Sequence, residues 1–403
     1  MGPVSLYAAP LTLQQAETQL LQSNHAVVAA RRALEGATAD ITIAGQAPNP
    51  TVTYSATNYS PRNGLGGGSL GDKRLDQTLL VQQPIERGNR RELRRTGAEA
   101  LAQAARADYA DARRQQRLAL HQAWFDWLAA AEKKRLLGET AGLYKRGMVA
   151  TDLRLKLGDV SRVEASRLRI EALRAENDAR GALADYEKAR ADVAFLLGEP
   201  DLKNLEPVID WPALENSDLA AAGRTLDSRP DVLAAGSRIQ ASERRRELAR
   251  SLTTRDVTLG AQVERDPTTI SGVTYGLQVS IPIFARYGYE GERARAESDY
   301  YATIEDSERV RQGVSTEITR ARADLAAATD RLQRVETETL PQAREVGAAS
   351  EFAYKKGALN LTDLLDARRT LRAVELEAVT ARADHAKARA AWLAATQWEQ
   401  NRE

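Results

Sequence analysis

Residues 273–281 read VTYGLQVSI, and apolar and polar side chains alternate through the whole stretch. Its apolar positions are Val273, Tyr275, Leu277, Val279 and Ile281. A period of two predicts a β-strand with one apolar and one polar face. A tilted strand crosses a bilayer in about 9–11 residues, so the stretch also has the length of a membrane strand.

Three more stretches alternate in the same way. The expected strands cover residues 51–58, 75–84, 256–264 and 272–282. The pattern fits two structures equally well: strands in contact with lipid, or a small amphipathic sheet packed on a soluble helix bundle. Aromatic residues in or near the strands fit a belt at a membrane surface, although such rings are common in any sheet. These residues are Tyr54, Tyr59, Tyr275, Phe284, Tyr287 and Tyr289.

Long segments without proline make up most of the remaining chain. No proline occurs between Pro84 and Pro200. Since a proline inside a helix costs about 3 kcal/mol, this gap permits very long helices. Residues 89–145 are rich in alanine, arginine, leucine and glutamate, and as a helix they would reach roughly 85 Å. Such a helix needs partners along its whole length, as in bundles and coiled coils.

The chain also repeats itself. The segment around Val27 resembles the segment around Val232, a shift of 205 (232 − 27). Pro84 matches Pro282, a shift of 198 (282 − 84), so the second copy has a shorter loop between its strands. Each copy reads helix, strand, loop, strand, long helix, turn, long helix. The expected organisation is an N-terminal flank at 1–10, a first repeat at 11–198, a connector at 199–228, a second repeat at 229–397 and a tail at 398–403.

This duplication favours the membrane interpretation of the strands. Each pair of strands lies between helices that are too long for a compact α+β domain. Four strands leave open edges, and lipid offers no partner to unpaired backbone groups. If the strands cross a membrane, several copies of the chain must contribute to one barrel.

Composition excludes several other classes of protein. The absence of cysteine excludes a disulfide framework, a thiolate metal site and a lipid-bearing N-terminal cysteine in the sequence as given. A net charge of +1 gives no reason to expect a nucleic-acid partner. No stretch approaches the roughly 18 apolar residues of a transmembrane helix, and the first residues do not have the pattern of a secretory signal. We expect His25, His121 and His385 to be packed or solvated helix residues.

The sequence contains no catalytic or cofactor-binding constellation. The glycine-rich segment 64–71 lacks the lysine and the following helix of a phosphate-binding loop, and we expect a hairpin loop there. Pairs such as Glu92 with Arg95 are typical of solvated helix surfaces. Trp124 and Trp127 are expected to pack where helices meet. The chain is therefore expected not to be an enzyme and to hold neither a cofactor nor a resident metal.

The sequence of the second turn resembles that of a known family. Residues 354–367 read YKKGALNLTDLLDA. This motif, the duplicated plan and the proline that ends each second strand resemble the TolC-like outer-membrane efflux channels over residues 11–397. Residues 83–90, QPIERGNR, further resemble the branch that serves heavy-metal efflux of the cobalt–zinc–cadmium type.

The resemblance implies a mainly α protein with a membrane β-barrel. In this family three chains form a trimer, their helical hairpins form an α-barrel across the periplasm, and their strands form one 12-stranded barrel in the lipid of the Gram-negative outer membrane. It also implies two protein partners, a periplasmic adaptor and an inner-membrane transporter of the RND type. The duct itself carries out no chemistry.

The resemblance places the periplasmic entrance at the helix turns. Gly357 permits the chain reversal, and Asp363 and Asp366 follow it. In a trimer each aspartate would form a ring of three carboxylates that attracts cations. Solvated turn charges without a gating role are the alternative.

The first repeat has a related turn with different charges. Gly158 corresponds to Gly357, and Glu164 lies six residues after it, as Asp363 does after Gly357. Arg167 stands where the second repeat has Asp366. This departure leaves a double acidic ring in doubt and permits an Asp–Arg latch instead.

Three functions remain open. The leading hypothesis is a passive exit duct for small solutes, with heavy-metal cations as cargo. A duct of the same fold could export drugs or proteins. A soluble coiled-coil scaffold with a small capping sheet is the alternative from another class.

Overall fold

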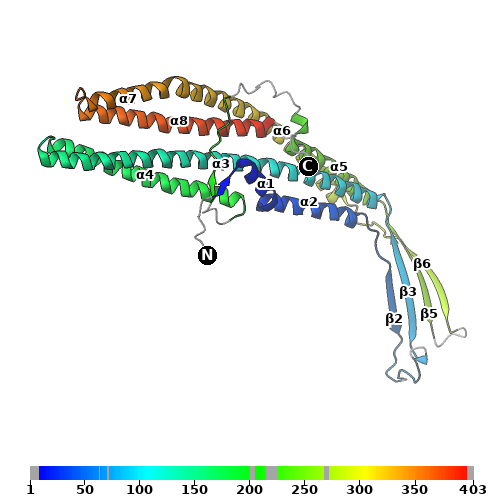
Figure 1. Cartoon of the computed structure of the whole chain (residues 1–403). Helices are drawn as coiled ribbons and strands as arrows, with labels where there is room; N and C mark the ends of the chain where they lie inside the picture. Colours follow the sequence, from blue (N-terminus) through cyan, green and yellow to red (C-terminus); the bar gives the residue numbers. More distant parts are fainter. Residues whose placement is uncertain are drawn as a thin grey trace. The chain divides into compact units, whose positions relative to one another are not determined.

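The computed structural model of the chain describes residues 9–62, 64–69, 72–199, 205–214, 226–266 and 272–396 (Figure 1). The chain divides into two compact units. Unit 1 takes residues 1–32, 108–230 and 311–403, and unit 2 takes residues 33–107 and 231–310. Both units draw on both halves of the chain, so neither of the two sequence repeats forms a unit by itself.

Unit 2 contains a four-stranded antiparallel sheet in the order β2-β3-β5-β6. Strands β2 (Thr51–Thr57) and β3 (Asp76–Ile85) form one hairpin, and β5 (Val257–Arg265) and β6 (Thr274–Ser280) form the other. The hairpins join through β3 and β5, so both repeats contribute to one sheet (Figure 1).

The strands begin and end within two residues of the expected ranges, and β6 differs most. It ends at Ser280, whereas the pattern predicted a strand to residue 282. Pro282 has no N–H to donate to a ladder, so the strand stops before it. At the other end, Gly272 has a φ of +66°, which ends the extended conformation.

The pairing register separates apolar from polar side chains across the whole sheet. One row of paired residues contains Tyr54, Leu79, Val263 and Tyr275. The next row on that face contains Val52, Val81, Ala261 and Leu277. Between them, on the opposite face, lie Thr53, Leu80, Gln262 and Gly276. Because side chains alternate along every strand, one face is mainly apolar, apart from Gln77, Gln83 and Arg265. The other face is mainly polar, apart from Leu80 and Pro84.

Helices of unit 2 continue directly from the strands. The bounds of the helices that contribute to it are α2 His25–Ala44, α3 Arg90–Leu157, α5 Pro230–Ser251 and α6 Glu290–Arg334. The first part of α3 buries alanines, among them Ala98 and Ala104, and small side chains allow helices to approach closely. A Cβ at Gly97 would lie 3.5 Å from the Cβ of Arg244, so α3 and α5 are in close contact here.

Unit 1 has a core of aromatic and aliphatic side chains. Its other helices are α1 Leu13–Ser23, α4 Arg162–Leu196, α7 Leu340–Lys355 and α8 Leu361–Thr396. Trp124 and Trp127 are buried and pack edge to face at 5.5 Å, as expected from the sequence. They share their cluster with Leu20, Val193 and Ala386, so four helices meet at this point.

The connector and the N-terminal flank join this core. Strand β1 (Ala9–Leu11) pairs in parallel with β4 (Leu205–Pro207), and a 3₁₀ turn, η3, follows at Leu226–Ser228. Trp211 stacks on Phe125 at 6.1 Å and donates its indole N–H to Glu132 at 3.0 Å. The sequence had suggested only a flank and a connector outside the main body.

A π-helical turn interrupts the long helix of the second repeat. It spans Val335–Thr339 (η4) between α6 and α7. Pro341 follows in the first turn of α7, where its missing N–H removes one helical hydrogen bond. The corresponding α3 runs unbroken for 68 residues without a proline.

Over the residues that the structure describes, none of the helices has the length and apolar content needed to cross a membrane.

Candidate functional site

The two turns named from the sequence lie in unit 1, and each ends a helix in the same way. Gly158 has a φ of +82° and Gly357 a φ of +77°, a conformation that side chains rarely adopt. The N–H of Asp159 donates to the carbonyl of Arg154 at 2.9 Å, and that of Ala358 donates to Ala353 at 2.9 Å. These are Schellman caps, in which glycine lets the chain reverse between antiparallel helices.

Glu164 and Asp363 both act in the first turn of the following helix. The carboxylate of Glu164 accepts from the N–H of Ser161 at 3.0 Å, while the Ser161 hydroxyl accepts from the N–H of Glu164 at 3.2 Å. Asp363 donates its N–H to Asn360 Oδ1 and accepts from Asn360 Nδ2, both at 2.9 Å. The two acidic residues are therefore structural counterparts that cap α4 and α8.

Asp366 and Arg167 do not pair with each other. The carboxylate of Asp366 pairs with Arg369 of its own helix at 2.8 Å. Arg167 Nη1 donates instead to the hydroxyl of Thr362 at 2.9 Å and so joins α4 to α8. Within one chain, Arg167 thus contacts α8 through the Thr362 hydroxyl and not through the Asp366 carboxylate.

A stronger connection between the same helices lies one turn deeper. Arg369 donates to both carboxylate oxygens of Glu171, at 2.7 and 3.2 Å, and Arg174 also contacts Glu171 at 3.2 Å. Glu171 is buried near Tyr144, and the hydrogen bond from Arg369 holds the pKa of this carboxyl below its ordinary value. Sequence reasoning missed the pair, because Arg369 resembles any other arginine on a helix surface.

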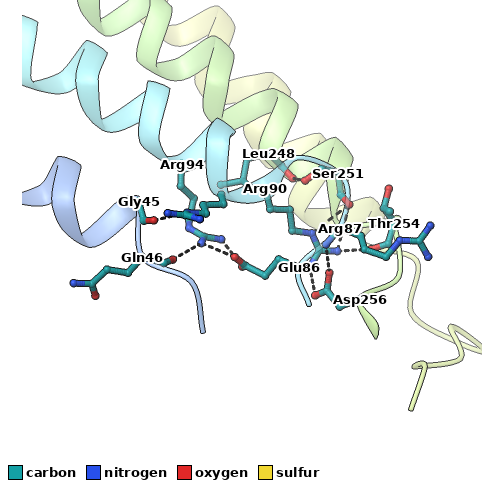
Figure 2. Close-up of polar contacts among 11 residues, drawn as sticks. Gly45, Gln46, Glu86, Arg87, Arg90, Arg94, Leu248, Ser251, Thr254 and Asp256 are labelled. Carbon is teal, nitrogen blue, oxygen red and sulfur yellow. Dashed lines mark hydrogen bonds and ion pairs between the residues drawn. The ribbon is translucent and has the colours of Figure 1, made fainter. Parts of the chain in front are cut away.

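The strand-to-helix junction of unit 2 is a second polar site, shown in Figure 2. Arg90, the first residue of α3, donates to the carbonyls of Ser251, Leu252 and Thr254 at 3.3, 3.2 and 2.5 Å. Its other nitrogen, Nη1, pairs with Asp256 at 2.6 Å. Arg90 thereby satisfies carbonyls at the C-terminal end of α5, which have no partner within that helix.

Two further arginines near the start of α3 bind the carbonyls of the two residues that follow α2. Arg91 donates to the carbonyl of Gly45. Arg94 donates to the carbonyl of Gln46 at 3.4 Å (Figure 2). Arg94 also forms two bonds to Glu86, at 2.5 and 2.8 Å. The bond from Arg94 lowers the pKa of the Glu86 carboxyl.

These contacts show the structural role of residues 83–90. Gln83 donates to the carbonyl of Pro48 at 2.9 Å, Glu86 holds Arg94, and Arg90 holds the end of α5. Gly88 has a φ of +71°, and a Cβ there would lie 3.0 Å from Thr254. The segment therefore ties the ends of both first-repeat and second-repeat helices to the root of the sheet.

The apolar face of the sheet is the third candidate site. Leu277 is 90% exposed and Tyr275 is 82% exposed, whereas Gly260 on the polar face is buried. On the polar face, a Cβ at Gly260 would lie 2.6 Å from the side chain of Gln278. A single chain thus exposes its apolar face more than its polar face, the reverse of a sheet in a soluble protein.

No resident metal site is evident in the part of the chain that the structure describes, where no group of three His, Asp or Glu side chains is arranged to bind an ion. The described sites consist of helix caps and ion pairs. They lie at the helix turns of unit 1 and at the strand-to-helix junction of unit 2.

Comparison with known proteins agrees with this architecture. The family described as "Outer membrane efflux protein" matches residues 17–199 and 221–396. Among curated proteins, the cobalt-zinc-cadmium resistance protein CzcC of Cupriavidus metallidurans is 27% identical over 385 residues, which cover 90% of this chain and 84% of CzcC.

Solved structures share the fold at low sequence identity. The structure of CusC has a TM-score of 0.77 at 15% identity and covers 97% of this chain and 93% of CusC. VceC of Vibrio cholerae has a TM-score of 0.76 at 18% identity and covers 95% of each chain. The open state of MtrE from Neisseria gonorrhoeae has a TM-score of 0.76 at 19% identity, with 98% and 93% covered. The chain belongs to the outer membrane efflux protein family.

Proposed function

We propose that this outer-membrane efflux protein forms a trimeric exit duct that conducts heavy-metal cations passively from the periplasm to the exterior. The three chains would close one 12-stranded barrel and one α-barrel, without catalysing a reaction. A periplasmic adaptor and an inner-membrane transporter of the RND type would deliver the cargo. Membership of the outer membrane efflux protein family argues against the alternative function of a soluble coiled-coil scaffold.

The exposed apolar face of the sheet is the observation that carries this proposal. Val52, Tyr275 and Leu277 lie on that face and are 66%, 82% and 90% exposed in the single chain. Water makes such exposure unfavourable, by about 25 cal/mol for each Å² of apolar surface, whereas lipid does not. The face therefore suits contact with acyl chains.

The edges of the sheet support assembly from several copies. Strands β2 and β6 each pair on one side only. An unpaired edge in lipid leaves backbone N–H and C=O groups without partners, each at a cost of several kcal/mol. Pairing β6 of one chain with β2 of the next removes both edges, and three chains of four strands give the proposed barrel.

The assignment of metal cations as cargo is the second part of the proposal. It is supported by the 27% identity to CzcC, whose name refers to cobalt, zinc and cadmium resistance. The acidic side chains of Asp363 and Asp366 are also exposed in the first two turns of α8. A duct that exports drugs has the same fold, so the cargo must be tested directly.

Substitution on the two faces of β6 tests the membrane assignment. Leu277→Arg places a charge on the apolar face and should weaken insertion by about 2–4 kcal/mol if that face meets the bilayer midplane. Gln278→Arg, on the polar face, is the matched control and should still insert. Folding into lipid vesicles, followed by protease protection, measures both. Equal insertion of the two variants would contradict the proposal.

Deletion of the chain from its host tests the cargo. Sensitivity to zinc, cobalt or cadmium salts should rise, and the wild-type chain should restore resistance. A rise in sensitivity to hydrophobic drugs alone would assign the duct to the other cargo class.

A further inference from the structure

Three exposed arginines lie where the sheet of unit 2 joins its helices. Arg87 follows the end of β3, Arg255 precedes β5, and Arg286 follows β6. Because Ile85 pairs with Val257 and Thr258 pairs with Ser280, these segments lie at the same end of the sheet. We call Arg87, Arg255 and Arg286 the arginine rim.

Among the described residues, the guanidinium groups of the arginine rim have no ion-pair partner, unlike those of the arginines just behind it. Asp256 pairs with Arg90 at 2.6 Å, and Glu86 pairs with Arg94 at 2.5 Å. Among the residues that the structure describes, no Asp or Glu forms an ion pair with a guanidinium group of the rim. Glu86 and Asp256, the sequence neighbours of Arg87 and Arg255, are thus paired with other arginines, and the three rim arginines are exposed.

Exposed apolar and aromatic side chains border the rim. Ile283 is 81% exposed and Tyr287 is 58% exposed, on the segment that carries Arg286. Phe284 packs edge to face on Tyr289 at 5.4 Å, and the guanidinium of Arg255 lies over the ring of Phe284 at 5.5 Å. Aromatic rings beside cations at the end of an apolar surface are typical of a membrane–water boundary.

We propose that the arginine rim binds the headgroups of anionic phospholipids in the leaflet that faces the periplasm. This inference rests on the proposed membrane insertion of the sheet. Guanidinium groups bind phosphate through two parallel hydrogen bonds, and they do so most strongly where water is partly excluded. The neighbouring apolar side chains, such as Ile283, would contact the first carbons of the acyl chains, which a free phosphate ion does not have.

Lipid titration of the purified trimer tests the proposal. The variant Arg87→Gln/Arg255→Gln/Arg286→Gln is compared with wild type in detergent, with phosphatidylglycerol, phosphatidylcholine or inorganic phosphate added. Native mass spectrometry counts bound lipid, and thermal unfolding measures stabilisation. Each arginine near an anionic surface changes affinity about fivefold, so the triple variant should bind phosphatidylglycerol on the order of 100-fold more weakly. Neither phosphatidylcholine nor phosphate should distinguish the two proteins.

A second triple variant controls for the loss of three charges. Arg154, Arg162 and Arg322 are also exposed and have no ion-pair partner among the described residues, but they lie in unit 1. Arg154→Gln/Arg162→Gln/Arg322→Gln should keep the phosphatidylglycerol affinity of wild type. Equal affinity of wild type and the rim variant would overturn the proposal, as would equal stabilisation of wild type by phosphate and by phosphatidylglycerol.

Conductance separates this inference from the proposed function. In a bilayer of phosphatidylcholine alone, wild type and the rim variant should show the same single-channel conductance. Absence of any conductance from wild type contradicts the exit duct. Normal conductance without a preference for phosphatidylglycerol contradicts the lipid site alone.

Discussion

Arg369 of α8 binds both carboxylate oxygens of Glu171 in α4, at 2.7 and 3.2 Å, across a sequence separation of 198 residues. Glu171 is buried, whereas the Arg369 side chain is 45% exposed. The pair lies behind the two turns that the sequence named, and it joins the helical hairpin of the first repeat to that of the second. An opening of these hairpins would have to break it.

Removing the Arg369–Glu171 pair should weaken the contact between α4 and α8. Arg369→Gln leaves Glu171 with Arg174 as its remaining cationic partner. Because Arg369 is partly solvated, we expect the coupling energy of the pair to be about 1 kcal/mol. A double-mutant cycle of Arg369→Gln with Glu171→Gln, measured by thermal unfolding, gives this energy. Arg135→Gln, which disrupts an exposed pair within α3, should leave the unfolding temperature unchanged. A coupling energy of zero would exclude a latch here.

The same carboxyl predicts a change of stability with pH. The hydrogen bond from Arg369 lowers the folded-state pKa of Glu171 below its ordinary value of 4.5. A group with a lowered folded pKa stabilises the protein fully above the unfolded pKa, and this contribution disappears as pH falls through the folded pKa. The unfolding temperature of wild type should therefore fall more steeply below pH 4.5 than that of Glu171→Gln. Parallel pH curves for the two proteins would contradict this assignment.

Neutralising the turn aspartates should alter ion selectivity. If Asp363 and Asp366 line the periplasmic entrance of a trimer, Asp363→Asn/Asp366→Asn should lower the preference for cations over anions. Reversal potentials in a salt gradient across a planar bilayer measure this preference. Asp185→Asn/Asp306→Asn removes two exposed carboxylates elsewhere and is the control. Unchanged selectivity and conductance in the turn variant would remove these aspartates from the gate.

Replacing Arg90 should destabilise the strand-to-helix junction of unit 2. Its side chain is 13% exposed and binds three carbonyls and Asp256, and Arg90→Met removes all of these bonds. Ser251 and Asp256 then keep the backbone N–H groups of Thr254 and Arg87 as donors. We expect a loss of about 2–4 kcal/mol in the free energy of unfolding. Faster hydrogen exchange in residues 251–257 would locate the effect. Arg95→Gln on the same helix affects only pairs within α3, and it should change neither measurement.

Two glycines on the polar face should determine the width of the pore in the proposed barrel. A Cβ at Gly260 would lie 2.6 Å from Gln278, and a Cβ at Gly276 would lie 2.9 Å from Gln262. Gly260→Ala/Gly276→Ala should lift both glutamines from the sheet and lower single-channel conductance. Gly236→Ala, a site with open space in α5, is the control. Conductance equal to wild type in the double variant would place the polar face away from the pore.

The faces of the sheet could be predicted from the sequence because they depend on local geometry alone. Successive side chains of a strand point to opposite faces, so the alternation around Leu277 fixes which residues share a surface. The glycine turns at Gly158 and Gly357 are local in the same sense, since a positive φ favours glycine wherever it occurs. The sequence named Glu164 and Asp363 as entrance candidates, and the structure places both in helix caps formed within one helical turn.

Partners distant in sequence could not be predicted in this way. The pairing of β1 with β4, the stacking of Trp211 on Phe125 and the binding of Arg369 to Glu171 each join separate segments of the chain. Arg90 and Arg91 are neighbours of the same type, yet one binds the end of α5 and the other the end of α2. Their sequence context gives no means to tell these roles apart.

The sequence by itself therefore determined the strands, their two faces, the long helices and the turns between them, because each depends on backbone preferences within a few residues. Only the tertiary structure decided which arginines neutralise buried carboxylates, which cap helices and which remain exposed. That choice depends on which helix ends and carboxylates packing brings within hydrogen-bond distance, and packing joins residues that are far apart in the chain.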